Sequence, residues 1–103
     1  MNKIRGEVKF KANKSEYVLI PTFNAIAAIE GELEKSIIRI LNEIETKGLT
    51  LLEQKVIIKH GLKASNIEIT NEELIEIIQS VGYINTYKYS CEFLSNIIAK
   101  PKI

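Results

Sequence analysis

The 103-residue sequence contains no aspartate and has only one cysteine, one histidine and two prolines. All 13 acidic residues are glutamate, so the phosphoryl-transfer and Ca²⁺ sites that depend on aspartate are not expected. One cysteine cannot form an intrachain disulfide, and one cysteine with one histidine cannot make a structural zinc site within this chain. The five glycines are scattered singly, so there is no glycine-rich phosphate loop. We therefore expect no cofactor and no metal.

His60 and Cys91 are the residues best suited to catalysis, and both lack suitable neighbours. His60 is expected at a helix end, just before Gly61, where a cationic imidazole favours the helix dipole. Cys91 falls on an apolar helical stripe, which is typical of a small core residue rather than a nucleophile. We therefore expect no catalytic residue and no enzymatic activity.

The charge is almost balanced, with 14 basic and 13 acidic residues and a net charge of +1. This balance gives no long-range reason to bind nucleic acid or an anionic membrane. No apolar run is long enough to cross a bilayer, and the first ten residues lack the apolar centre of a secretory signal. Together with the single cysteine, these features indicate a cytoplasmic protein.

A β-hairpin is expected at about residues 4–20. Apolar and polar residues alternate over residues 4–11, as in a half-buried strand, and residues 16–20 are rich in strand-forming types. A two-residue loop at Asn13 and Lys14 aligns the apolar faces. The resulting pairs are Phe10 with Tyr17 and Val8 with Leu19. Because glycine is favoured where Lys14 stands, a longer loop stays open as an alternative.

Five helices are expected, at about residues 23–35, 37–46, 51–60, 71–81 and 84–99. Thr22 and Ser36 are suited to cap the first two, and Thr-x-x-Glu capping boxes begin the third at Thr50 and the fourth at Thr70. Glycines 48, 61 and 82 are expected to follow helix ends. The sequence therefore predicts a single domain, residues 1–103, of the α+β class and mostly α, with the hairpin packed on a bundle of four to five short helices.

The apolar side of the first helix is expected to face the core. Its residues are Phe23, Ile26, Ala27, Ile29 and Leu33.

The last helix is unusual because it is apolar on two sides. One stripe consists of Ile84, Tyr87, Cys91, Leu94 and Ile98. Tyr89, Phe93 and Ile97 project from the opposite side. Such a helix is either central in its own domain or covered by a partner. In a chain this short, we predict that Tyr89, Phe93 and Ile97 bind a partner or a second copy, and internal burial is the alternative.

An ordered series of short motifs covers nearly the whole chain, from about Arg5 to about Ile98. The series is Arg5-Gly6-Glu7, Tyr17-x-Leu19, Phe23-Asn24-Ala25-Ile26, Ile29-Glu30, Ser36-Ile37-Ile38, Gly48-Leu49-Thr50-Leu51, Gly61-Leu62, Thr70-x-x-Glu73 and Gly82. In this order it resembles the tail assembly chaperone family, also described as tail tube proteins, of gene transfer agents, tailed phages and prophages. Two positions depart from that pattern: Lys14 and Glu34 stand where the family usually has glycine.

The resemblance implies a non-catalytic protein of tail morphogenesis inside the producing or host bacterial cell. Its expected partners are the long helical tape-measure protein, which it keeps soluble, and other tail proteins such as tube subunits. A structural tail tube or connector subunit is the first alternative, although only two strands are apparent.

A DNA-binding regulator is the second alternative, because the third and fourth helices are short and capped. The expected connector at residues 60–69 is longer than the usual turn of about 3–4 residues in a helix-turn-helix. Glu72, Glu73 and Glu76 in the second of these helices would also be repelled by phosphates.

Overall fold

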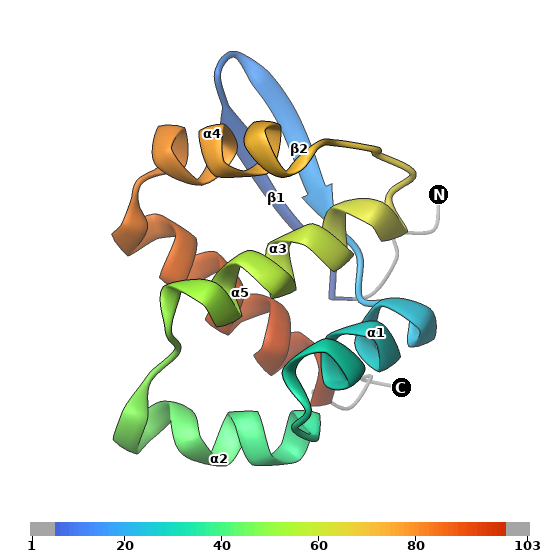
Figure 1. The fold of residues 1–103 in the computed structure, drawn as a ribbon, viewed down its shortest axis with the longest axis vertical. Coiled ribbons are helices and arrows are strands. Elements are labelled where there is room, and N and C mark those ends of the chain that lie inside the picture. The colour runs from blue at the N-terminus through green and yellow to red at the C-terminus, as the bar shows by residue number, and fades with distance from the viewer. Residues whose placement is uncertain (1–5, 99–103) are drawn as a thin grey trace.

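The structure, a computed structural model, describes residues 6–98, which form a two-stranded antiparallel sheet and five helices (Figure 1). The strands are β1 (Val8–Ala12) and β2 (Ser15–Leu19). The helices are α1 (Phe23–Leu33), α2 (Ile37–Lys47), α3 (Leu51–Ala64), α4 (Asn71–Val81) and α5 (Tyr83–Ile98). The predicted α+β, mostly helical fold is confirmed. Ile4 and Arg5, which open the expected hairpin, and residue 99, where the last helix is expected to end, lie outside the described residues.

The hairpin has the register that its apolar alternation predicts. Val8 pairs with Leu19, and Phe10 pairs with Tyr17. The loop contains only Asn13 and Lys14, whose φ angles of 51° and 69° are typical of a type I′ turn. Asparagine tolerates this left-handed conformation, whereas for most L-residues it costs roughly 1–2 kcal/mol. The loop thus has two residues, so the longer alternative is not formed. Because Lys14 is not an asparagine or a glycine, its left-handed backbone is strained.

α1 and α2 are separate helices joined through a left-handed residue. α1 begins after Thr22, whose hydroxyl accepts a hydrogen bond from the Ala25 N–H, and it ends at Leu33 rather than at residue 35. Glu34 follows with a φ of 57°, and its N–H donates to the Glu30 carbonyl. This is the conformation in which glycine commonly ends a helix, so it explains the earlier end of α1.

Phe23 does not face the core, contrary to the expectation for the first helix. Its side chain is 84% exposed. The buried residues of α1 are Ala25 and Ile29, which lie one turn apart on the side that contacts α3. Phe23 precedes Ala25 by two positions, so it projects from nearly the opposite side of the helix.

α3 continues through Gly61 to Ala64, so the prediction that Gly61 follows the helix end is wrong. Gly61 lies against β2, where a Cβ atom would approach the Leu19 Cβ to 2.9 Å. The Gly61 carbonyl also accepts a hydrogen bond from the Ile20 N–H at 3.2 Å. This glycine therefore allows the strand to pack closely on a continuing helix, and a sequence pattern alone does not distinguish that role from a helix end.

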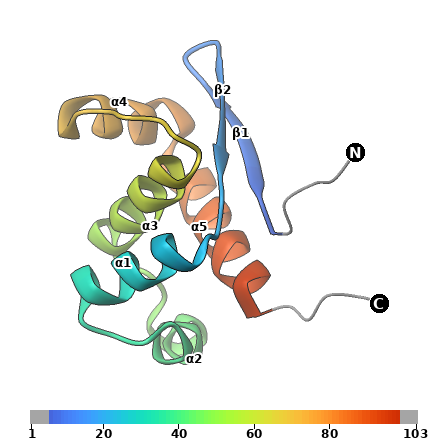
Figure 2. The ribbon, with the colours of Figure 1, turned by 90° about the vertical axis from the view of Figure 1, so that its right-hand side faces the viewer.

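α5 packs against elements on several sides. It contacts α2, α3, α4 and β1, and Phe93 and Leu94 have no exposed surface. Figure 2 shows the hairpin standing to one side of the helices, so that the two sides of α5 face different neighbours. One cluster of buried side chains joins the hairpin to the helices.

Candidate functional site

Of the three predicted partner-binding residues, Phe93 lies in the interior, and Tyr89 and Ile97 are partly buried. Phe93 is 0% exposed, and Ile97 is partly buried against the same core. The half-buried Tyr89 ring stacks on Phe10 of β1, with 5.3 Å between ring centroids and 24° between planes. The hairpin thus covers the side of α5 that was expected to be free. Phe93 is therefore buried within its own domain, which was the alternative to partner binding. The expectation that this side of α5 is an exposed partner face is wrong for Phe93.

Exposed apolar side chains gather instead on the first turn of α3, on α4 and on the first turn of α5. Of the seven large apolar side chains that are exposed among residues 6–98, five belong to these segments. They are Leu51, Leu52, Ile75, Tyr83 and Ile84. The other two, Phe23 and Ile38, lie on α1 and α2. A contiguous exposed apolar patch marks an interaction site more often than isolated apolar residues do.

Four of these five side chains line an open groove of about 340 Å³, which we call the α3–α4 groove. One wall is formed by Leu51, Leu52 and Lys55 of α3. The other wall is formed by Ile75, Ile78 and Gln79 of α4, and Tyr83 of α5 completes the lining. In Figure 1 these segments lie together at the left of the molecule.

Local sequence signals fix both walls of the groove. The Thr50 hydroxyl accepts from the Glu53 N–H at 3.0 Å, and the Glu53 carboxylate accepts from the Thr50 N–H at 2.8 Å, which starts α3 directly before Leu51. The same predicted arrangement starts α4. At the other end of α4, Gly82 has a φ of 93° and is the only residue between α4 and α5. Both capping boxes are therefore confirmed, and they position the groove residues.

The groove residues were not predicted as a site, although the sequence contains a signal for them. Leu52 precedes Lys55 by three positions and Lys59 by seven, so it lies on a face of α3 that otherwise carries lysine. Ile75 similarly follows Glu72 and precedes Gln79 on an exposed face of α4. Apolar residues within polar helical faces are the pattern that could have indicated this surface.

His60 lies within α3 rather than at its end, so its predicted helix-dipole role is wrong. Its Nε2 atom is 2.8 Å from Oε1 of Glu32, and Nζ of Lys59 is 2.8 Å from the same oxygen. Hydrogen bonds from Lys59 and then His60 hold the pKa of Glu32 below its ordinary value. Glu32 belongs to α1, so this group ties α1 to α3.

Cys91 has the partly buried, apolar surroundings that the sequence predicts. Burial raises the pKa of its thiol, which keeps it protonated near neutral pH and lowers its reactivity. Within residues 6–98, no group of three or more His, Cys or Glu side chains is placed to hold a metal ion.

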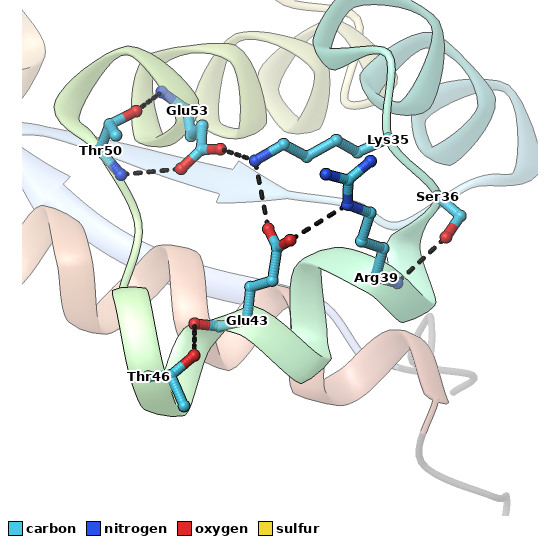
Figure 3. Close-up of polar contacts among 7 residues, drawn as sticks. All are labelled: Lys35, Ser36, Arg39, Glu43, Thr46, Thr50 and Glu53. Atoms are coloured by element: carbon cyan, nitrogen blue, oxygen red, sulfur yellow. Dashed lines mark hydrogen bonds and ion pairs between the residues drawn. The ribbon is translucent and has the colours of Figure 1, made fainter.

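A polar cluster around Lys35 connects three segments of the chain (Figure 3). Lys35 Nζ lies 3.2 Å from Oε1 of Glu43 and 2.9 Å from Oε2 of Glu53. Arg39 and then Lys35 lower the pKa of Glu43. Burial by itself would raise the pKa of Glu53, but the Thr50 N–H and Lys35 outweigh burial and lower it. The cluster joins α2 to the first turn of α3, next to the groove.

None of the helices within residues 6–98 is both long enough and apolar enough to cross a bilayer.

A scan against protein-family models found no match, and searches of curated proteins and of solved structures found no significant similarity. The candidate site is therefore argued from the residues of this chain.

Proposed function

We propose that this protein is a non-catalytic chaperone of tail assembly in a tailed phage, prophage or gene transfer agent. It acts in the cytoplasm of the producing bacterial cell, where it binds the long helical tape-measure protein and keeps it soluble. The observation that carries the proposal is the α3–α4 groove, because an open apolar groove between two helices suits the apolar face of a third helix.

The energetic gain of such docking comes from side chains that are half exposed in this chain. Leu52 is 65% exposed, and Leu51 and Ile75 are also accessible. Full burial of such a side chain is worth roughly 1.5–3 kcal/mol, so completing its burial contributes roughly 1 kcal/mol. Several such contributions supply the apolar centre that a protein interface requires.

The backbone conformation of Lys14 and Glu34, the two positions where the family usually has glycine, also supports the proposal. Lys14 has a φ of 69° and Glu34 a φ of 57°. Both values lie in the left-handed region that glycine occupies readily and other residues seldom adopt. The chain thus keeps the backbone conformation that glycine favours at these two positions, although its side chains differ.

Co-expression with a tape-measure protein tests the proposal. We expect a complex to copurify and the soluble fraction of the partner to increase. Leu52→Glu should reduce both effects, because it places a charge in the groove. Phe23→Glu is the matched control, since Phe23 is also exposed but lies on α1. An unchanged partner solubility with no complex contradicts the proposal.

A tail tube or connector subunit would be distinguished by its presence in the particle. Many copies in purified particles would replace the chaperone proposal with a structural role. The sheet within residues 6–98 has two strands, which are few for a tube wall built from sheets.

A DNA-binding regulator would be distinguished by salt-dependent binding to duplex DNA. The connector between α3 and α4 comprises residues 65–70, which is shorter than predicted but still longer than a typical helix-turn-helix turn of about 3–4 residues. Glu72 and Glu73 occupy the first turn of α4, where they oppose binding to phosphates.

A further inference from the structure

We infer that the α3–α4 groove takes an amphipathic helix that carries a carboxylate next to its apolar anchors, and that Lys55 pairs with this carboxylate. The inference rests on the proposed function and deepens it, because it names the chemistry of the partner segment. It depends on two features of the groove: its walls are helices, and its charge is asymmetric.

The helical walls determine the backbone of the occupant. α3 and α4 use their interior N–H and carbonyl groups within their own helices, so the groove offers few backbone partners to an extended peptide. An extended segment would place its own polar backbone on an apolar surface, where each unpaired group is costly. A helix satisfies its backbone internally and presents side chains at spacings that fit between two other helices.

Lys55 determines the charge that the occupant carries near its anchors. Among the described residues that line the groove, Lys55 alone is charged, and its side chain is half buried beside Leu51, one turn earlier. No ion pair involves Lys55 within residues 6–98. Docking an apolar helix would bury this ammonium further, and a carboxylate on the partner would compensate for its lost hydration.

The charges around the groove favour an acidic group only on the side of the docked helix that faces α3. Lys59, one turn beyond Lys55, is already paired with Glu32. Glu72 and Glu76 are exposed on α4 near Ile75 and would repel acids on that side of the occupant. The partner segment is therefore a helix with an acidic group on one flank, not a uniformly acidic one.

Two synthetic helical peptides provide the probe. Both are about 18 residues, or five turns, long and share one leucine stripe. They differ at a single flanking position one turn from a central leucine, which is glutamate in the first and glutamine in the second. We expect the glutamate peptide to bind the wild-type protein roughly fivefold more tightly, as a partly buried ion pair allows. Fluorescence anisotropy with labelled peptides measures both dissociation constants.

Two charge variants of α3 test whether Lys55 causes the preference. The preference for glutamate should vanish in Lys55→Gln and reverse in Lys55→Glu. Lys63→Glu is the matched control, because Lys63 is exposed on the same helix outside the groove, and it should keep the preference. Added salt should reduce the preference more than it reduces binding of the glutamine peptide.

Several results would overturn the inference. They are equal affinity for the two peptides, an equal loss of preference in Lys63→Glu, and no binding of either peptide up to ~1 mM, the limit of a weak complex. Self-association that Leu52→Glu abolishes would instead identify a second copy as the occupant. Copurification of a tape-measure protein with wild type and Lys55→Glu alike would preserve the proposed function and overturn only the role of Lys55.

Discussion

Two apolar surfaces of this protein have similar residues but different neighbours. Around α5, Phe93 has no exposed surface, and Tyr89 stacks on Phe10 of the hairpin. At the α3–α4 groove, Leu52 and Ile75 stay exposed. The first surface is closed by a segment from the opposite end of the chain, and the second has no cover within residues 6–98. The difference teaches that an apolar helical face marks an interaction site only when no other segment of the chain covers it.

The closed surface depends on contacts between the two ends of the described chain. The Asn96 side-chain amide donates to the Gly6 carbonyl at 3.1 Å, next to the start of β1. Phe10 lies between Tyr17 and Tyr89, with ring centroids 5.6 and 5.3 Å away. These contacts hold the hairpin over α5, so the hairpin acts as the cover that a partner was expected to supply.

The largest expected effect comes from replacing a covered side chain. Phe93→Ala should lower the free energy of unfolding by about 3–5 kcal/mol, because it leaves a cavity in the fully buried core. Leu52→Ala at the groove should change it by no more than about 0.5 kcal/mol and should weaken peptide binding. Urea denaturation and fluorescence anisotropy measure the two quantities.

Equal stability losses in these two variants would break the comparison. If Phe93→Ala does not fold, Phe93→Leu leaves a smaller cavity and should still be less stable than Leu52→Ala.

Much of the fold could be predicted because its signals are local. Thr50 with Glu53 marks the start of α3, and the alternation of the first strand with a two-residue turn sets the hairpin register. Gly82 likewise marks the end of α4 through its own backbone conformation. Such signals involve residues a few positions apart, so the sequence contains all of their parts.

Apolar residues on polar helical faces hint at the site, but the sequence alone does not define it, because exposure is a non-local property. Whether Phe93 or Leu52 is exposed depends on which segment lies on it, and periodicity does not report that. Gly61 shows the same limit, since its role depends on the distant Leu19. A short chain can cover its last helix on more than one side. Here α5 contacts α2, α3 and α4 as well as β1 of the hairpin.

The close seating of the hairpin on α3 gives the next largest effect. Gly61→Ala should lower the free energy of unfolding by about 1–3 kcal/mol, because the added Cβ meets the Leu19 Cβ at 2.9 Å. Gly31→Ala is the matched control in α1, where an added Cβ has nothing within 4 Å. It should raise the free energy of unfolding by about 1 kcal/mol through helix propensity. The same sign for both variants, measured by thermal and urea unfolding, would contradict the tight contact.

The turn of the hairpin offers a stabilising change. Lys14→Gly should raise the free energy of unfolding by about 0.5–1 kcal/mol, because glycine relieves the left-handed strain and offsets its own entropy cost. Lys11→Gly, in β1, should lower it by a similar amount. Peptide binding at the groove should be unchanged in both variants, since the hairpin does not line the groove. A destabilised Lys14→Gly would argue against the type I′ turn.

The smallest expected effect is on the pH dependence of stability. It involves Glu53, in the first turn of α3 next to the groove. The pKa of Glu53 is lowered in the folded protein from the ordinary value of 4.5, so its ionised form stabilises the fold. That contribution is complete above about pH 4.5 and is lost as the pH falls through the lowered value. Glu53→Gln keeps the capping hydrogen bond but removes the charge next to Lys35. We expect this variant to lose less than about 1 kcal/mol at neutral pH and to depend less on pH between about 6 and 3. Urea midpoints across this range measure the difference, and parallel curves for wild type and variant would exclude Glu53 as a source of acid sensitivity at the start of α3.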